Sequence, residues 1–320
     1  MLTYKNLGYY GRFGNQLFQY AALVGIADKI GCAYGINYQN AQREKIITSF
    51  VGPEKLELLE AFNLSAEDIS NRSIPTKFCH ERKFDFDRRF FNLDSEVDAD
   101  LFGYFHTEKY FSHCVGKIRS EFEFKTHIRE EAERQIEQLR DEKTLVSLHV
   151  RRGDYAKVKY INPCKLSYYI KAISLFENCK FVVFSNDISW CQRNFFGENF
   201  VYVIGNNKFV DMCMMGLCDH HIIANSSFGW WGAWLNPSKQ KKVVAPRKWF
   251  ELFSAINGQD IYCDEWIVLG TWFERIEWVL AQLLAKGESK IWVERLQYCL
   301  KYPDRLIPEL KAKLDSKVRG

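Results

Sequence analysis

The chain has 320 residues, 47% of them hydrophobic and 26% charged, and this balance excludes a disordered chain. Its formal net charge of +4, from 44 basic and 40 acidic residues, excludes a nucleic-acid binder that relies on counterion release. Because domains usually contain about 100 to 200 residues, the length predicts two domains with a cleft between them.

The cysteines and the N-terminus bear on where the protein is found. Ten cysteines are scattered without a Cys-x-x-Cys pair, so we expect reduced and mostly buried thiols. The first residues lack a secretory signal, and no run of about 18 apolar residues occurs in the sequence. These features predict a cytoplasmic location.

The first predicted element is a helix over residues 17–30, where apolar residues recur three and four apart, and Gly31 ends it. The preceding glycine-bracketed turn, residues 11–16, would leave Asn15 and free backbone N–H groups at the N-terminus of this helix. Such a helix end attracts anions or hydroxyl groups. Residues 40–125 are less regular, and we expect loops and short elements there.

The second half of the chain has a regular pattern. A charged helical stretch at 127–143 leads into the apolar run 144–150, so we expect a new domain to begin near residue 140. Further strands are predicted at 180–184, 200–204, 221–224 and 242–245, and helices at 167–177, 189–196, 208–218 and from Ser227 onward. This alternation predicts a parallel sheet of βαβ units, whose ligands bind beyond the carboxyl ends of the strands.

Three polar clusters each follow a predicted strand directly, so we expect them to converge on one crevice. The first is Arg151-Arg152-Gly153-Asp154, after the strand at 144–150. Two adjacent guanidinium groups fit a phosphate, which meets their geometry with paired hydrogen bonds. The alternative is a salt-bridge network between the domains that includes Asp154.

The other two clusters precede helices. Ser185-Asn186-Asp187 follows the strand at 180–184, and helix N-capping is the alternative role for its serine and its aspartate. Asn225-Ser226-Ser227-Phe228 follows the strand at 221–224, and its hydroxyl and N–H groups at the start of a helix suit a diphosphate. The tryptophans of this helix, at 230, 231 and 234, favour core packing over sugar stacking.

Four segments together resemble the signature motifs of glycosyltransferase family 11, the α-1,2-fucosyltransferases. The segments are residues 11–21, 149–154, 184–190 and 221–235, and they occur in the order found in that family. The resemblance runs from about residue 6 to about Trp266, where residues 262–266 are similar to the usual ending of the family. Residues 271–320 match no motif of it.

The resemblance implies an α/β, GT-B-like fold in which two Rossmann-type domains face a cleft. Residues 1–140 would form the N-terminal acceptor-side domain, residues 141–270 the GDP-fucose-binding domain, and residues 271–320 an additional helical tail. The tail carries an apolar stripe and a basic end. Packing on the body and attachment to the inner face of an anionic membrane are its two alternative roles.

The implied activity is an inverting transfer of L-fucose from GDP-β-L-fucose to the 2-hydroxyl of a terminal galactoside on a glycan, such as a bacterial lipopolysaccharide. Two alternatives remain open. One is a fucosyltransferase of another linkage or acceptor, and the other is a non-catalytic protein that binds a sugar nucleotide or a glycan on the same scaffold.

The resemblance also implies which residues bind the donor. They come from both halves of the chain: Arg12, Arg151, Arg152, Asn186, Asp187, Asp211, Asn225, Ser226, Ser227 and Phe228. In this interpretation the two arginines bind the diphosphate, residues 226–228 close over it, and Asp211 accepts from the guanine N1 and N2 donors. A solvated helix residue is the alternative for Asp211.

The predicted catalytic residues are His149, Arg152, Asp154 and Asn15. The arginines should lower the pKa of Asp154, so it is a weak base and is expected to hold Arg152 in place. His149, Asn15 and His106 are other candidate bases, and departure of the leaving group can also proceed without a strong one.

No metal or other cofactor is expected, because two arginines and a helix N-terminus can stabilise the leaving diphosphate. Metal-dependent transferases hold a manganese-bound diphosphate with an Asp-x-Asp pair. The two such pairs of this chain, at 85–87 and 98–100, do not follow a clear nucleotide-binding strand.

Overall fold

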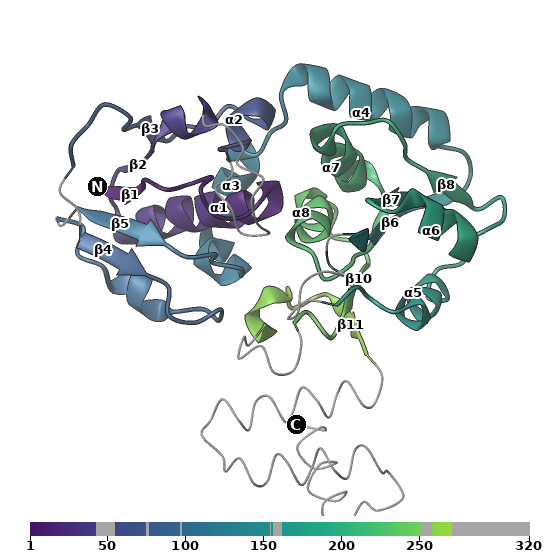
Figure 1. Cartoon of the computed structure of the whole chain (residues 1–320). Coiled ribbons are helices and arrows are strands. Elements are labelled where there is room, and N and C mark those ends of the chain that lie inside the picture. The colour runs from purple at the N-terminus through teal and green to yellow at the C-terminus, as the bar shows by residue number, and fades with distance from the viewer. Residues whose placement is uncertain are drawn as a thin grey trace, which may run out of the picture.

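The computed structural model describes residues 1–42, 55–74, 77–96, 98–153, 155, 162–250 and 258–270. Two parallel β-sheets, each with helices beside it, lie next to one another (Figure 1). The first unit contains strands between residues 2 and 102, and the second contains strands between residues 144 and 269. The predicted α/β class with two parallel sheets, as in GT-B-like folds, is confirmed.

The first sheet has the strand order β3-β2-β1-β5-β4. Its strands are short: β1 Leu2–Tyr4, β2 Tyr34–Ile36, β3 Glu67–Asp68, β4 Lys77–His80 and β5 Ala99–Phe102. Helix α1, Phe13–Ile30, lies against this sheet, and Gly31 ends it with φ at 73°. The helix predicted at 17–30 is confirmed and begins four residues earlier.

The remaining elements before the second sheet are mostly short. They are η1 Tyr38–Gln42, α2 Leu58–Ala61, η2 Arg88–Asn92, η3 Glu108–Tyr110, η4 Ser112–Cys114, α3 Val115–Glu121 and α4 Thr126–Leu139. The expectation of loops and short elements over residues 40–125 is therefore confirmed where these residues are described. Strands of two to four residues have too few positions for a period-two pattern to be recognised.

The second sheet has the order β11-β10-β9-β6-β7-β8. Its strands are β6 Thr144–Val150, β7 Cys179–Ser185, β8 Phe200–Tyr202, β9 His220–Ile222, β10 Val243–Pro246 and β11 Ile267–Leu269. Its helices are α5 Leu166–Ile173, α6 Ile188–Asn194, α7 Lys208–Leu217, α8 Ser227–Leu235 and the short η6 Gln259–Ile261. The alternation predicted from residue 144 onward is confirmed.

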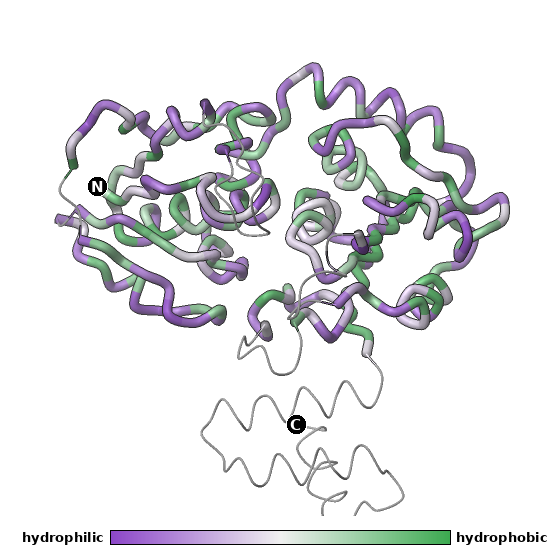
Figure 2. Tube along the Cα trace, in the orientation of Figure 1, coloured by the Kyte–Doolittle hydropathy of each residue, from purple (hydrophilic) through white to green (hydrophobic). Residues whose placement is uncertain are grey.

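One apolar core joins the two units. Phe18 of α1 packs on Trp230 and Trp231 of α8, with ring centroids 4.4 and 5.0 Å apart. All three tryptophans of α8 are buried, which confirms core packing over sugar stacking. Apolar and neutral residues predominate along α1 and α8, whereas the outer helix α4 is largely hydrophilic (Figure 2). The ends of α1 and α8 are therefore held at a defined position relative to each other.

Other expectations about organisation are not tested by this fold. Helix α4 packs on α7 of the second unit, and the division of the chain at residue 140 stays a prediction. The tail at 271–320 lies outside the described residues, so its helical structure and its membrane contact stay predictions. Within the described ranges, no helix combines the length and the apolar character needed to cross a membrane.

Candidate functional site

Each sheet has one point where the strand order reverses, and these points position the site. Strand β6 pairs with β7 on one side and β9 on the other, so the reversal lies between β6 and β9. In the first sheet β1 pairs with β2 and β5, so the reversal lies between β1 and β5. Ligands of open parallel sheets bind beyond the carboxyl ends of the strands at such a point.

The predicted polar residues follow these four strands. Arg151 and Arg152 come after β6, and Asn225, Ser226 and Ser227 come after β9. The turn into α1 follows β1, and His106 follows β5. The fold therefore brings residues separated by more than 200 positions in the sequence to one junction between the units.

A hydrogen bond between Asn15 and Ser227 connects the two units at this junction. The Ser227 hydroxyl donates to Asn15 Oδ1 at 2.6 Å. The N-terminal turns of α1 and α8 are in direct contact, because a Cβ added at Gly14 would lie 2.7 Å from both Phe228 N and Ser227 C. Two helix N-termini with their N–H groups therefore meet at one place, which favours an anion there.

The two ends of α8 differ in their partners. At its carboxyl end, Arg119 Nη2 donates to Trp234 O at 2.8 Å, and Lys241 Nζ donates to Ala233 O at 2.9 Å. At its amino end, the side chain of Ser226 makes no capping hydrogen bond to the described residues. The first N–H groups of α8 therefore remain available to a ligand, while two cations offset the negative end of the helix dipole.

Arg152 is held by three contacts of the second unit. Its guanidinium carbon lies 4.1 Å from the centre of the Trp190 ring, and its Nε lies 3.7 Å from Asp187 Oδ2. Its backbone N donates to Asn186 Oδ1 at 2.9 Å. The Asp187 carboxylate also accepts from Trp190 N at 3.1 Å, so this residue caps α6 as the capping alternative predicted. Asp154 lies outside the described residues, and its proposed role beside the arginines stays a prediction.

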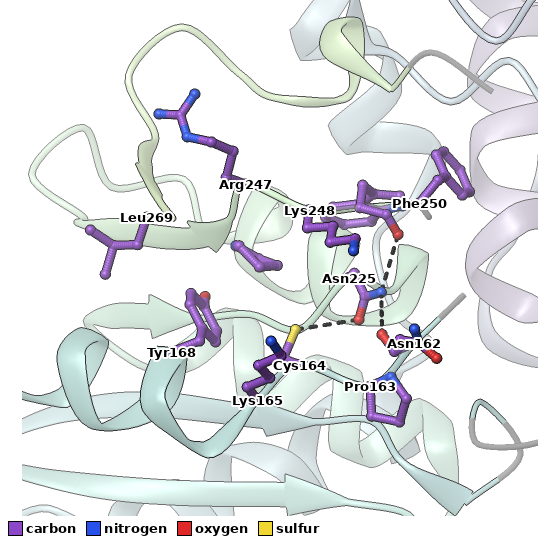
Figure 3. Close-up of a pocket in the computed structure, with 12 residues that line it drawn as sticks. Asn162, Pro163, Cys164, Lys165, Tyr168, Asn225, Arg247, Lys248, Phe250 and Leu269 are labelled. Carbon is purple, nitrogen blue, oxygen red and sulfur yellow. Dashed lines mark hydrogen bonds between the residues drawn. The ribbon is translucent and has the colours of Figure 1, made fainter. Parts of the chain in front are cut away.

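Two predicted donor-binding residues, Arg12 and Asn225, differ in burial and in their hydrogen bonds. The Arg12 side chain is exposed at the start of α1, and its carbonyl accepts from Asn15 N at 2.8 Å. Asn225 is buried and donates to the carbonyls of Asn162 and Trp249 at 3.0 and 3.1 Å. Asn225 is one of the residues that line the pocket drawn in Figure 3, together with Asn162 and Lys248. Its amide therefore holds the pocket wall together.

His149 lies beneath the first turn of α8. The imidazole is buried against the Phe228 ring, with ring centroids 5.7 Å apart, and a Cβ added at Gly229 would lie 2.5 Å from His149 Nδ1. Burial, and then the charge of Arg151, lower the pKa of His149 to about 3. A neutral, enclosed imidazole of this kind is a weak proton acceptor.

His106 occupies a similar environment on the side of the first unit. Burial lowers its pKa to about 3, and its Nε2 lies 3.1 Å from Asn15 Oδ1. That oxygen can only accept, so we infer that Nε2 of the neutral ring carries the proton and donates it. His106 therefore fixes the orientation of the Asn15 amide, and the amide oxygen receives hydrogen bonds from both units.

Asp211 lies on α7 and is half-buried, so it is not a solvated helix residue. Burial raises its pKa to about 6, against the opposing effect of a hydrogen bond from Asn206. Its Oδ1 is enclosed and has no hydrogen-bond partner among the described residues. A buried acceptor oxygen of this kind is costly unless a ligand donates to it.

One buried carboxylate near the junction, that of Glu81, is not among the residues predicted from the sequence. Glu81 follows β4, is buried, and accepts hydrogen bonds from Tyr104 N at 2.7 Å and Phe105 N at 3.1 Å. Burial raises its pKa to about 7, and Asp87 and Asp85 contribute in the same direction. No motif contains Glu81, so only the neighbouring position of β4 and β5 in the sheet reveals its contact with this loop.

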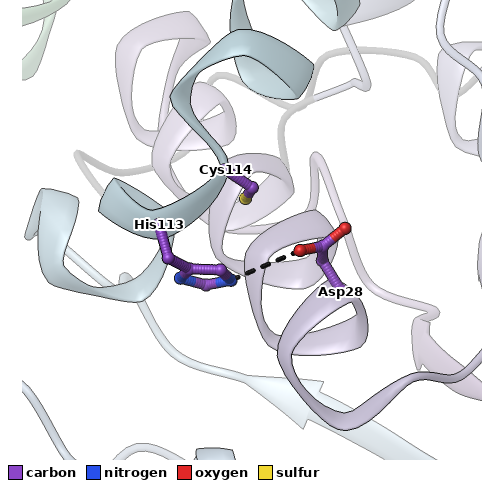
Figure 4. A group of neighbouring side chains, drawn as sticks. All are labelled: Asp28, His113 and Cys114. Carbon is purple, nitrogen blue, oxygen red and sulfur yellow. Dashed lines mark ion pairs between the residues drawn. The ribbon is translucent and has the colours of Figure 1, made fainter.

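Several carboxylates outside the junction have partners of their own. Asp98 pairs with the amino group of Met1 at 2.7 Å, and Asp100 accepts from the hydroxyl of Thr3 at 2.7 Å. Figure 4 shows Asp28 next to His113 and Cys114, the His113 ring 3.6 Å from the carboxylate. Lys117 also contacts Asp28, at 3.1 Å. We assign no metal to these groups, and metal independence stays a prediction.

The buried state of His149 predicts a loss of stability in acid. Its pKa lies far below the ordinary value of 6.5 in the folded chain, so protons bind the unfolded chain first as the pH falls below 6.5. At pH 5.5 this linkage removes about 1.4 kcal/mol of unfolding free energy that is present above pH 7. In urea unfolding at pH 7.5 and pH 5.5, the unfolding free energy of His149→Gln should therefore fall by about 1.4 kcal/mol less than that of the wild type.

The matched control for that comparison is His127→Gln, because His127 is exposed on α4. The assignment fails if the unfolding free energy of His149→Gln changes between the two pH values by the same amount as that of the wild type.

The sequence is similar to one protein family over most of its length and to several known enzymes. The model of the family described as "Glycosyl transferase family 11" matches residues 5–270. An O-antigen biosynthesis glycosyltransferase, WbnK of Escherichia coli, is 39% identical over 135 residues, or 38% of this chain and 44% of that protein. An α-1,2-colitosyltransferase of Escherichia coli is 29% identical over 284 residues, or 80% of this chain and 96% of that protein.

More distant matches include an animal enzyme and two solved structures. Galactoside α-(1,2)-fucosyltransferase 1 of Saimiri sciureus is 28% identical over 244 residues, or 70% of this chain and 63% of that protein. The chain thus spans less than two thirds of two of these three relatives. The structure of NodZ α-1,6-fucosyltransferase soaked with GDP-fucose has a TM-score of 0.48 at 14% identity, covering 74% of this chain and 92% of that one. POFUT1 in complex with GDP has a TM-score of 0.46 at 11% identity, covering 76% and 98%.

Proposed function

The chain belongs to glycosyltransferase family 11, and from this premise we propose that it transfers L-fucose from GDP-β-L-fucose to the 2-hydroxyl of a terminal galactoside. The observation that carries the proposal is the contact between the α1 and α8 N-termini, at the carboxyl edge of the sheet where Arg151 and Arg152 follow β6. A diphosphate leaving group needs fixed positive charge and N–H donors at the place where negative charge develops. The junction supplies both, from the helix ends and from the guanidinium group.

In the proposed mechanism the acceptor hydroxyl attacks the anomeric carbon as the bond to the β-phosphate breaks, so the configuration inverts, GDP leaves and the hydroxyl proton is released to water. Arg151, Arg152 and the N–H groups of α8 bind the departing diphosphate, and Phe228 closes over it. Asn15 accepts from the Ser227 hydroxyl and so fixes the first turn of α8, whose N–H groups would face the diphosphate. His149 and His106 are too weakly basic to take the hydroxyl proton, so leaving-group stabilisation is proposed as the main catalytic contribution.

A divalent metal is not part of the proposal. The positive charge that metal-dependent transferases draw from an ion is assigned here to the paired arginines and the two helix ends.

The test is an assay of the pure protein with GDP-fucose and a panel of β-galactosides, with and without EDTA. The expected result is an α-1,2-fucosylated product formed at the same rate in both conditions. Binding of GDP-fucose without transfer or hydrolysis would instead identify the non-catalytic alternative, and loss of activity in EDTA would overturn metal independence.

Asp211 is proposed to recognise the guanine base. A carboxylate that accepts from both the N1 and the N2 donors of guanine forms a charge-assisted pair, and Asp211 Oδ1 has no hydrogen-bond partner among the described residues. Asp211→Asn is expected to weaken GDP binding by about 10- to 100-fold, because one acceptor becomes a donor. Calorimetric titration with GDP and with inosine diphosphate, which lacks the 2-amino group, measures this.

The wild type should prefer GDP over inosine diphosphate, and Asp211→Asn should lose that preference. If the variant retains both the affinity and the preference, Asp211 does not bind the base. Asn206→Ala is an informative second variant, since it removes the hydrogen bond to Asp211 that opposes the effect of burial on its pKa.

A second donor is favoured by one comparison. The colitosyltransferase is matched over 96% of its length, and colitose is fucose without the 3-hydroxyl. A colitosyl transfer from the corresponding GDP-sugar is therefore the competing candidate. Parallel assays with the two donors at equal concentration decide between them through the ratio of their kcat/KM values.

A further inference from the structure

Three aromatic rings from three separate segments meet beside His106. The Phe84 ring lies 5.7 Å from that of Tyr104 and 5.0 Å from that of Phe250, measured between centroids. Phe84 and Tyr104 both pack on the His106 ring, at 5.2 and 5.3 Å. Phe84 and Tyr104 belong to the first unit and Phe250 to the second, so this aromatic cluster spans the junction.

The aromatic cluster is close to the proposed diphosphate site. Its centre, His106, is hydrogen-bonded to Asn15, and Asn15 is hydrogen-bonded to Ser227 at the start of α8. Two side chains therefore separate the cluster from the N-terminus of α8. In a transfer reaction the attacking hydroxyl must come within about 3.5 Å of the sugar carbon attached to the diphosphate. A bound acceptor has to occupy this neighbourhood.

The position of the cluster in the first sheet agrees with a binding role. Tyr104 and His106 follow β5, and Phe84 follows β4, so these residues come after the carboxyl ends of the strands at or beside the reversal point. On the other side, Phe250 lines the pocket that contains Asn225 and Lys248 (Figure 3). The cluster is thus continuous with a hollow of the second unit.

Backbone geometry holds the Tyr104 loop in place. Gly103 and Phe105, the neighbours of Tyr104, have φ angles of 157° and 53°, and the second is uncommon for a bulky residue. Glu81 accepts the N–H groups of Tyr104 and Phe105 and so maintains this conformation. Strained backbone of this kind persists where the surroundings determine it, and it is concentrated at functional sites.

The chemistry of the cluster favours one class of ligand. The three residues Phe84, Tyr104 and Phe250 are half-buried and not fully enclosed. In a β-galactoside the axial 4-hydroxyl leaves the C3, C4 and C5 hydrogens together on one side of the ring, and this apolar face can pack on aromatic rings. A glucoside, whose 4-hydroxyl is equatorial, has no such continuous face.

We propose that Phe84, Tyr104 and Phe250 form the acceptor subsite and bind the apolar face of a galactose-type pyranose. The inference rests on the proposed transferase function and adds the residues that select the acceptor. It assigns the preference for the galactose 4-epimer to the aromatic cluster rather than to the residues proposed to bind the donor.

The experiment compares Tyr104→Leu, Phe84→Leu and Tyr104→Phe with the wild type. The KM for methyl β-D-galactopyranoside is expected to rise about tenfold in both leucine variants, because an aliphatic side chain lacks the flat face of the ring. Tyr104→Phe keeps the flat face of the ring, so its KM for the galactoside should equal that of the wild type. GDP affinity should stay within about twofold in all three, since the cluster does not contact the proposed diphosphate site.

Phe196→Leu is the matched control, because Phe196 is 80% exposed in the loop after α6 and lies in the second unit, outside the junction. Methyl β-D-glucopyranoside is the matched ligand. An unchanged galactoside KM in both leucine variants, or an equal loss of GDP affinity, would overturn the acceptor assignment.

A binding measurement separates this inference from the proposed function. Saturation-transfer NMR with GDP present detects methyl β-D-galactopyranoside on the protein without any turnover. If the wild type fails to process GDP-fucose but binds the galactoside through Tyr104, the proposed function fails and the subsite stands. If GDP-fucose is turned over but the NMR signal is the same in wild type and Tyr104→Leu, the subsite fails alone.

Discussion

Arg152→Ala is expected to lower the turnover of GDP-fucose by about 100- to 1000-fold, the size of effect seen when a preorganised charge-stabilising donor is removed from a transition state. GDP affinity should fall less, by about tenfold, because the leaving diphosphate gains negative charge only as the glycosidic bond breaks. The Trp190 ring and Asp187 position this guanidinium, so its orientation is determined before the donor binds.

Two further variants make this prediction specific. Arg152→Lys keeps the charge but loses the planar fork and the stacking on Trp190, so it should retain only part of the activity. Arg193→Ala removes an exposed arginine from α6, the helix that carries Trp190, and this variant should behave as the wild type. Steady-state kinetics and GDP titration measure both quantities. Survival of GDP affinity and turnover in Arg152→Ala would remove Arg152 from the site.

Gly14→Ala is expected to disrupt the junction between α1 and α8. The new Cβ would lie 2.7 Å from Phe228 N and Ser227 C, and these are backbone atoms that cannot rotate away. Overpacking of this kind costs about 1 to 3 kcal/mol of stability. A displacement of about 1 Å between Asn15 and Ser227 is also expected to lower the transfer rate by about 100-fold. Urea unfolding and initial rates measure the two effects.

The control is Gly116→Ala in α3, where an added Cβ meets no atom within 4 Å. Alanine favours a helix over glycine, so this variant should be neutral or more stable by up to about 1 kcal/mol. If Gly14→Ala has the stability and activity of Gly116→Ala, then the close contact of the helix ends has no functional role.

The elements of the second half were predicted well, and the strands of the first half were not. The strand at 144–150 was predicted with the bounds that β6 has, and α1, α4 and α7 were each found. Strands β1 to β5 were not recognised, because no regular alternation of strands and helices marks them in the sequence and because their pairing depends on partners distant in sequence. The first sheet could therefore be expected only from the resemblance.

For the site, position after a strand was the informative signal. Ser227 and Arg152 could be placed at the carboxyl edge of one sheet, since that edge follows from the order of strands and helices. The roles of the histidines could not be predicted. His106 and His149 were candidate bases from residue type alone, whereas burial makes both neutral and weakly basic. Burial is a property of the packed chain, and no local pattern reports it.

The sequence by itself determined the class of the fold, the regular second half and the paired arginines that follow its first strand. Periodicity and position after a strand are local properties, and so they can be recognised in the sequence alone. Only the tertiary structure decided that Asn15 meets Ser227, that Glu81 holds the Tyr104 loop, and that Phe84 contacts Phe250 of the second unit. Such contacts depend on which strands become neighbours where each sheet reverses its order, and this is a result of packing over the whole chain.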